Sequence, residues 1–134
     1  MIEKYELALK ARKNAYAPYS NYSVGACLVL KDGKYIVGSN VENSSFGLTN
    51  CAERSALFAA ISLGYKKEDF KELVIATIND IPGSPCGACR QVITELMEPD
   101  ALITLINPKL KNTISLKVND LLPYAFSGEK IDEK

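Results

Sequence analysis

The sequence carries cysteines and a glutamate at spacings suited to metal chemistry. Cys51 and Glu53 lie in the segment CAE, and Cys86 and Cys89 lie in the segment PCGAC. Three protein ligands with one open position are typical of catalytic rather than structural zinc, and thiolates are good zinc ligands. A neighbouring carboxylate can move protons at such a site. The two segments therefore predict a catalytic zinc site, provided that the fold brings them together.

The composition excludes several other classes of function. The chain has no histidine, so a Ser-His or Cys-His catalytic pair and a His-ligated metal are ruled out. Lys and Arg number 16, as do Asp and Glu, and this neutral balance lacks the basic character of a nucleic-acid-binding protein. No apolar run approaches the roughly 18–20 residues that span a bilayer, and the start does not resemble a signal peptide. We expect a cytoplasmic protein with neither nucleic acid nor membrane as a partner.

The two cysteine segments fall where helices are expected to begin. A helix is predicted over residues 51–64, because this stretch is rich in Ala and Leu and closes on a glycine. A second helix is predicted to open with Ser84 as its N-cap and Pro85 at its first position, and to run to about residue 97. Helix N-termini carry partial positive charge, which favours thiolates.

The remaining elements indicate one α/β domain over residues 1–134. A helix is predicted near the start, a hairpin turn at Asp32-Gly33, and strands on both sides of that turn and later in the chain. Alternation of strands and helices in the middle of the chain predicts a partly parallel sheet covered by helices. The predicted ranges are a helix at 2–14 and strands at 24–30, 35–41, 73–78, 101–106 and 113–116.

Taken singly, these residues also have ordinary structural explanations. The Cys-x-x-Cys pair alone could be a redox dithiol, and Glu53 could form a capping box with Asn50. Arg54 could offset the negative charge that three thiolates leave on zinc, or it could be a solvated helix residue. Cys27 lies in an apolar strand, where a buried and unreactive thiol is expected.

Together and in this order, the motifs resemble those of the zinc-dependent deaminases, in which the glutamate carries protons and is not a ligand. The segments NVEN (residues 40–43), CAERSAL, PCGACRQV and LLPYAF (residues 121–126) are similar to those of the short, homotetrameric cytidine deaminases, over nearly the whole chain. The resemblance implies a three-layer α/β fold: a mixed five-stranded sheet with helices packed on both faces. It also implies one Zn²⁺ per subunit, held by Cys51, Cys86 and Cys89.

The same resemblance implies roles for the neighbouring residues. Glu53 would take a proton from the zinc-activated water, deliver it to N3 of the cytosine ring and protonate the departing amino group. Asn40 and Glu42 would hold the ribose, and the backbone N–H of Ala52 would bind O2 of the base. Tyr22 stands where the family usually has a phenylalanine against the pyrimidine, which is a small departure from the pattern.

Two further aromatic residues match positions in the family. Phe46 corresponds to another aromatic of the substrate pocket, and Phe126 to one that reaches into a neighbouring subunit's site, which implies a homotetramer with shared active sites. The expected reaction is hydrolysis of cytidine and 2′-deoxycytidine to the uridine forms and ammonia, in pyrimidine salvage. Two alternatives remain open: a deaminase of a cytosine-containing antibiotic such as blasticidin S, and a noncatalytic zinc module with Cys27 as the spare fourth ligand.

Overall fold

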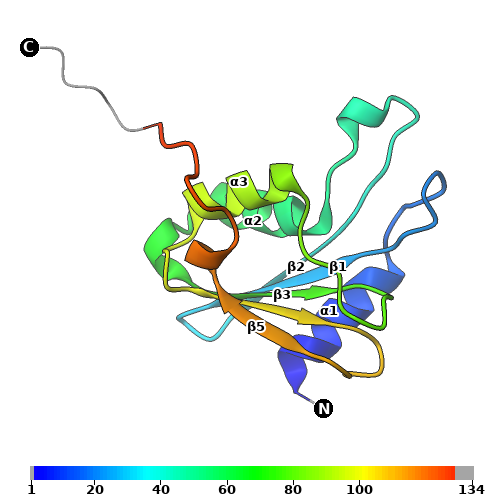
Figure 1. The fold of residues 1–134 in the computed structure, drawn as a ribbon, viewed down its shortest axis with the longest axis horizontal. Helices are drawn as coiled ribbons and strands as arrows, with labels where there is room; N and C mark the ends of the chain where they lie inside the picture. Colours follow the sequence, from blue (N-terminus) through cyan, green and yellow to red (C-terminus); the bar gives the residue numbers. More distant parts are fainter. Residues whose placement is uncertain (1, 129–134) are drawn as a thin grey trace, which may run out of the picture.

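A five-stranded mixed sheet forms the centre of the computed structural model, which describes residues 2–128 (Figure 1). The strand order is β2-β1-β3-β4-β5. β3 and β4 pair in parallel, and the other neighbours pair antiparallel. The strands are β1 Gly25–Leu30, β2 Tyr35–Ser39, β3 Phe70–Ala76, β4 Leu102–Ile106 and β5 Ile114–Lys117.

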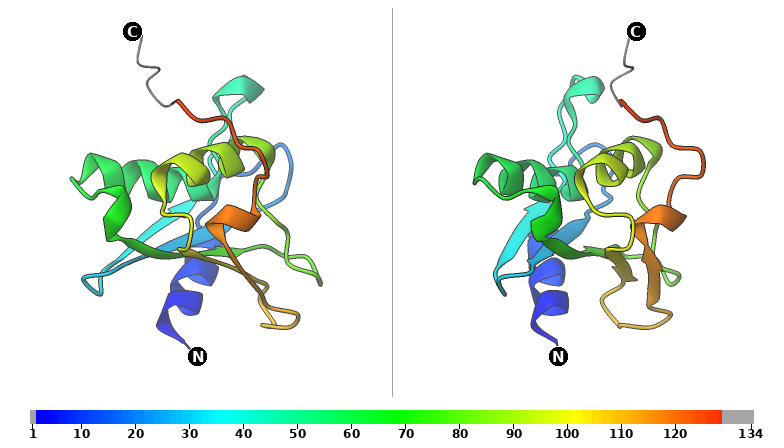
Figure 2. Two further views of the ribbon diagram at one scale, coloured as in Figure 1. Left: turned by 60° about the vertical axis from the view of Figure 1, so that its left-hand side comes forward. Right: turned by 90° about the vertical axis from the view of Figure 1, so that its left-hand side faces the viewer.

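Helices cover both faces of this sheet, so the predicted three-layer α/β architecture is confirmed. Figure 2 shows α1 (Glu3–Lys13) on one side of the sheet and α2 (Ala52–Ser62) and α3 (Gly87–Leu96) on the other. The larger part of the core lies between the sheet and the α2–α3 pair, and a smaller cluster lies under α1. Every residue of β1 is buried, as expected of a strand with both faces covered. Within residues 2–128, no helix combines the length and the apolar character needed to cross a bilayer.

The sheet topology brings the starts of α2 and α3 to the same end of the strands. β1 runs antiparallel to both β2 and β3, so these two strands point the same way. Their last residues, Ser39 and Ala76, both pair with Gly25. The chain leaves each strand there and continues through a loop to a helix, α2 after β2 and α3 after β3. The two cysteine segments, 35 residues apart, therefore meet beside the start of β1.

The start of α3 differs from the prediction. Ser84 is not the N-cap and Pro85 is not the first helical residue, because the helix begins at Gly87 with Cys86 as its N-cap. The Cys86 sulfur accepts a hydrogen bond from the backbone N–H of Cys89 at 3.5 Å, in place of a capping hydroxyl. Ser84 Oγ instead accepts a hydrogen bond from Arg90 Nη2 at 2.8 Å.

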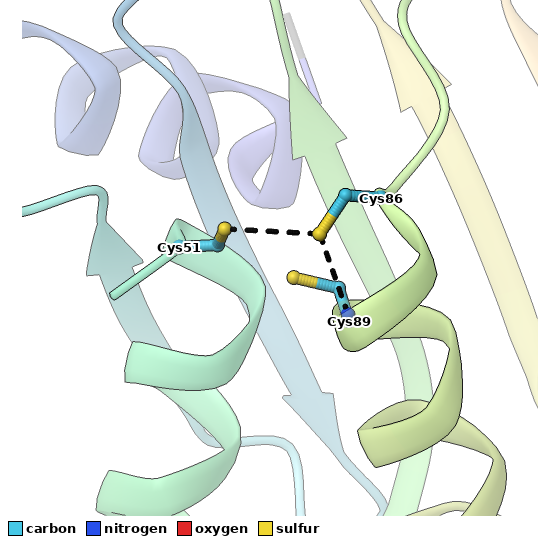
Figure 3. Close-up of side chains that lie close together, drawn as sticks. All are labelled: Cys51, Cys86 and Cys89. Atoms are coloured by element: carbon cyan, nitrogen blue, oxygen red, sulfur yellow. Dashed lines mark hydrogen bonds between the residues drawn. The ribbon is translucent and has the colours of Figure 1, made fainter. Parts of the chain in front are cut away.

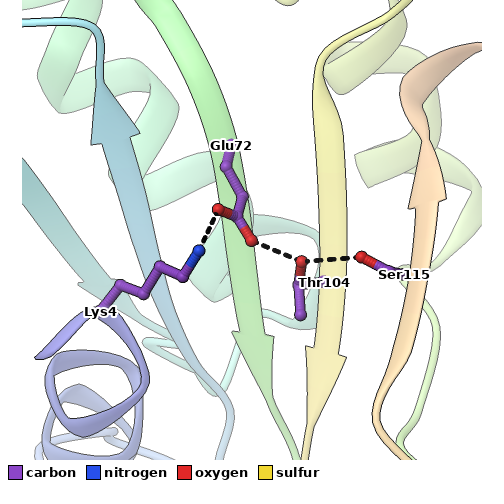
Figure 4. A network of polar contacts seen from close by, with 4 residues as sticks. All are labelled: Lys4, Glu72, Thr104 and Ser115. Carbon is purple, nitrogen blue, oxygen red and sulfur yellow. Dashed lines mark hydrogen bonds and ion pairs between the residues drawn. The ribbon is translucent and has the colours of Figure 1, made fainter. Parts of the chain in front are cut away.

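β3 also begins three residues earlier than predicted, because a charged residue in it is buried. Glu72 is 3% exposed on the α1 face of the sheet. Lys4 Nζ lies 2.6 Å from its Oε1, and the Thr104 hydroxyl donates to its Oε2 at 2.5 Å (Figure 4). Ser115 Oγ lies 3.4 Å beyond, on β5. A carboxylate can be buried when it is paired and hydrogen-bonded in this way. From the local sequence alone, however, a charged residue indicates an exposed position outside a buried strand.

Candidate metal centre

Three cysteine sulfurs converge where α2 and α3 begin (Figure 3). The Sγ atoms of Cys51, Cys86 and Cys89 all lie within 4.8 Å of one another, and those of Cys51 and Cys86 are 4.0 Å apart. Tetrahedral zinc with Zn–S bonds of about 2.3 Å places its sulfur ligands about 3.8 Å apart. The donor set and its spacing therefore fit one Zn²⁺.

The fourth cysteine cannot close this site. Cys27 packs in the smaller core cluster against α1, on the opposite face of the sheet from α2 and α3. Burial raises the pKa of its thiol to about 12, as expected of an unreactive buried cysteine. A closed four-cysteine site that includes Cys27 is thus wrong for this fold, and the three-sulfur cluster leaves one coordination position for another ligand.

The protonation states of Cys51 and Cys89 depend on each other, because a hydrogen bond links their side chains. A hydrogen bond from the Cys89 thiol, followed by the nearby Arg54 guanidinium, lowers the pKa of Cys51 to about 5 despite its burial. The same hydrogen bond and burial raise the pKa of Cys89, so that Cys89 retains its proton. A divalent cation is the group that allows all three sulfurs to be thiolates together.

Arg54 contacts the cluster directly. Its Nη2 donates to the Cys51 sulfur at 3.2 Å, and this bond raises the pKa of the guanidinium, which stays charged. Its Nε is buried and has no hydrogen-bond partner within residues 2–128. The interpretation of Arg54 as a solvated helix residue is therefore wrong, because its guanidinium lies against the Cys51 sulfur.

Glu53 is buried beside the sulfurs. Its exposed fraction is 4%, and it lies in the first turn of α2. Burial, and then the charge on Cys51, raise the pKa of its carboxyl. The capping box with Asn50 is not formed, because the N-cap of α2 is Cys51 and the Asn50 side chain donates instead to Ser55 Oγ at 3.2 Å. A carboxyl with a raised pKa is a stronger proton acceptor than an ordinary surface glutamate, as a proton carrier needs to be.

A cavity of about 270 Å³ opens onto this cluster. Several of its lining residues were not predicted from the sequence, among them Ile75, Thr77, Gly83 and Ser84. The only feature of the sequence that could have indicated these residues is their position. They lie near the end of a buried strand or between that strand and PCGAC. No Lys or Arg within the described residues lines the cavity. The predicted site residues that line it are Tyr22, Asn40, Glu42, Cys51, Ala52, Glu53 and Cys86.

Asn40 and Glu42 are held by the loop that precedes β1. Asn40 is buried, its Nδ2 donates to the Tyr22 carbonyl, and its Oδ1 accepts from the Val24 N–H, both at 2.8 Å. One N–H and one lone pair of this amide remain for a ligand. Glu42 Oε1 accepts the backbone N–H groups of Tyr19 and Ser20 at 3.0 Å each. The Ser20 hydroxyl also bonds to Glu42, and these bonds lower the pKa of the carboxyl, which stays ionised.

Phe46 and Phe126 do not line this cavity. Phe46 is 74% exposed and packs edge-on against Tyr19, with ring centroids 5.9 Å apart, beside a neighbouring cavity that shares Glu42. Phe126 is 76% exposed, and its carbonyl accepts from Gln91 Nε2 at 3.2 Å. Within one chain, the structure brings the cysteines, Glu53, Asn40 and Glu42 together but leaves these two aromatic rings outside.

The comparisons with known proteins agree with this site. The sequence model of the cytidine and deoxycytidylate deaminase zinc-binding region matches residues 2–105. A cytidine deaminase of Halalkalibacterium halodurans is 46% identical over 127 residues, which cover 94% of this chain and 93% of the relative. A cytidine deaminase of Sporosarcina psychrophila is 47% identical over 123 residues, 91% and 88% of the two chains.

A solved structure gives the same result for the fold. The crystal structure of a cytidine deaminase from Burkholderia pseudomallei superposes with a TM-score of 0.89 and is 47% identical, covering 94% of this chain and all of that one. The chain therefore belongs to the cytidine and deoxycytidylate deaminase family. Its zinc-binding region contains the three-cysteine cluster described above.

Proposed function

We propose that the chain is a cytidine deaminase, which hydrolyses cytidine and 2′-deoxycytidine to uridine and 2′-deoxyuridine with release of ammonia. The observation that carries this proposal is the pairing of two features in one cavity: three convergent sulfurs and a carboxyl that is 4% exposed. A metal site with an open position and a proton carrier beside it is what hydrolysis of an aromatic amine requires.

Each residue of the site has a definite part in this reaction. Cys51, Cys86 and Cys89 hold the zinc, which when bound acidifies a water molecule near neutral pH. In the reaction, the water's oxygen would bond to C4 while Glu53 transfers its proton to N3 of the ring. Glu53 would then take the proton of the new C4 hydroxyl and deliver it to the amino group, so that the C4–N bond breaks, ammonia leaves and the C4 carbonyl of uridine forms. The Arg54 guanidinium stabilises the Cys51 thiolate through its 3.2 Å hydrogen bond.

The remaining residues of the cavity support an uncharged sugar as part of the substrate. The free N–H and lone pair of Asn40 and the ionised Glu42 are donors and acceptors for ribose hydroxyls. Ala52, at the first position of α2, offers a backbone N–H that no helical bond uses. Because the described lining has Glu42 and no Lys or Arg, a phosphate there would be repelled. We therefore propose nucleosides, not nucleotides, as substrates.

The direct test is turnover by the zinc-loaded protein. We expect loss of cytidine absorbance with one ammonia released per uridine formed. Glu53→Gln should retain its zinc and its unfolding temperature but lose about 10²–10⁴-fold in kcat, the range for general acid–base catalysis. Hydrolysis of blasticidin S without hydrolysis of cytidine would favour the antibiotic deaminase instead. Full activity of Glu53→Gln would remove the glutamate from the mechanism.

We also propose that the active protein is a homotetramer whose sites are shared between subunits. The exposure of Phe46 and Phe126 supports this, because an apolar ring that leaves most of its surface in water has area to bury against another copy. Light scattering gives the oligomeric state. Phe126→Ala should raise KM while the neighbouring Ser127→Ala should not. Normal KM and normal assembly in Phe126→Ala would refute the shared site.

We further propose that residues 1–134 form one deaminase domain and that the protein works in the cytoplasm. All four cysteines are free thiols, which are typical of proteins in a reducing compartment. Cell fractionation tests the location, and recovery of the chain outside the cytoplasm would contradict it.

A further inference from the structure

The hydroxyl of Tyr22, the departure from the family pattern noted above, has a specific partner. Tyr22 lines the cavity, and its Oη donates to Asn79 Oδ1 at 2.5 Å, across 57 residues of sequence. Asn79 lies in the loop between β3 and α3 that leads to Cys86. The backbone of that loop is itself fixed, because Asn107 Nδ2 donates to the Asn79 carbonyl at 3.1 Å and Asn107 is buried.

The same loop also leaves space for the hydroxyl. A β-carbon at Gly83 would lie 2.7 Å from Tyr22 Oη, closer than β-carbons in proteins approach another atom that is not bonded to them. Gly83 has no positive φ, so its backbone conformation does not require glycine. Its N–H donates to Thr77 Oγ1 at 2.8 Å, which holds it at this distance from the ring. The tyrosine hydroxyl is therefore the main reason for the missing side chain, with Asn79 Oδ1 at 3.3 Å and Thr77 Oγ1 at 3.4 Å as the next atoms that a β-carbon would meet.

From these contacts we infer that Asn79 and Gly83 are positioning residues for the substrate base. Asn79 fixes the end of the Tyr22 ring, and Gly83 provides the space that this orientation needs. Together they hold the aromatic ring at the cavity wall before substrate arrives, which reduces the ordering cost of binding. The inference rests on the proposed function, because it takes the base of a cytosine nucleoside as the group that meets the ring.

The first test is a steric rescue. Gly83→Ala should raise KM for cytidine about 10-fold with kcat within about 2-fold, because the new methyl group displaces the end of a side chain and not the backbone. Tyr22→Phe should raise KM only about 3-fold. The double variant Gly83→Ala/Tyr22→Phe should return to the Tyr22→Phe value, since the clashing oxygen is gone. Gly47→Ala, where a β-carbon would contact nothing within 4 Å in the same chain, is the steric control and should leave the unfolding temperature unchanged.

The second test isolates the hydrogen bond. Asn79→Ala should raise KM as much as Tyr22→Phe does, and the double variant should be no worse than either single one, because both remove the same interaction. If Gly83→Ala fails to fold, the KM values of Asn79→Ala, Tyr22→Phe and their double variant still test the positioning role. Unfolding temperatures within about 2 °C of wild type would separate a positioning effect from a loss of stability.

The outcomes distinguish this inference from the function on which it rests. If the zinc-loaded wild type does not deaminate cytidine, both the proposed function and the inference that depends on it are wrong. If the wild type is active but the KM effects of Gly83→Ala and Tyr22→Phe simply multiply, only the positioning role is overturned. An Asn79→Ala variant with wild-type KM would overturn it equally.

Discussion

Arg90 fixes the loop that presents Cys86, so its removal should weaken metal binding from outside the site. Its Nε donates to the Pro85 carbonyl at 2.8 Å, its Nη1 to the Leu121 carbonyl at 2.7 Å, and its Nη2 to Ser84 Oγ at 2.8 Å. Pro85 and Leu121 are buried, so Arg90→Ala leaves two buried carbonyls without this partner. We therefore expect both lower stability and a less well-placed Cys86 sulfur.

The magnitude of the Arg90→Ala effect follows from these three bonds. A hydrogen bond to a charged group contributes about 1.5–3 kcal/mol, and the partial exposure of Arg90 and the exposure of Ser84 reduce the total to about 2–4 kcal/mol. For a chain of this size that corresponds to a fall of roughly 6–16 °C in unfolding temperature. Groups that orient a metal ligand typically contribute 10–100-fold to metal affinity, and we expect a zinc affinity lower by that factor.

Competition with a chromophoric chelator measures the zinc affinity, and calorimetry measures the unfolding temperature. Arg90→Lys retains the charge but not the planar fork of donors, so it should recover part of the stability and little of the zinc affinity. Gln91→Ala is the matched control, because Gln91 contacts the C-terminal segment at Phe126 and not the Cys86 loop. Wild-type zinc affinity in Arg90→Ala, together with lower stability, would refute the link between this side chain and the metal ligand.

Three further perturbations address other charges and thiols. Arg54→Gln should keep zinc but lose about 10–100-fold in activity, because the Cys51 thiolate loses its 3.2 Å partner; an unchanged rate would show that this hydrogen bond does not contribute to catalysis. With zinc removed at pH 8, a thiol reagent should label equal numbers of cysteines in the native wild type and in Cys27→Ser, since a pKa of about 12 leaves a thiolate fraction of about 10⁻⁴ at Cys27; one label fewer in the variant would contradict this. Lys4→Met should lower the free energy of unfolding by about 1–3 kcal/mol at pH 7 in urea titrations. Because Glu72 raises the pKa of Lys4 above 10.5, the contribution of this pair is complete below that pH and is lost as the pH rises through the raised pKa. The difference between wild type and Lys4→Met should therefore shrink above about pH 10.5, and a difference that persists there would show that the ion pair is not its source.

Local sequence patterns depend on residues that are near one another along the chain. They predicted the structural features that such residues determine, namely the helices and strands. The alternation of helices and strands, the buried β1 and the glycine-closed α2 follow from hydrophobic spacing. The same spacing misplaced the start of α3, because a cysteine sulfur replaced the expected Ser84 hydroxyl as the cap. It also misplaced the start of β3, because Glu72 finds its partners on α1 and β4, far away in sequence.

By itself, the sequence determined which reactive groups are available: four cysteine thiols, a glutamate two residues after Cys51 and no histidine. Only the tertiary structure decided which cysteines meet. Cys27 is closer in sequence to Cys51 than Cys86 is, yet its strand turns its side chain to the opposite face of the sheet. The structure likewise paired the Tyr22 hydroxyl with Asn79 and with the space at Gly83. The physical reason is that strand order and side-chain facing arise from packing between distant segments, which no local periodicity encodes.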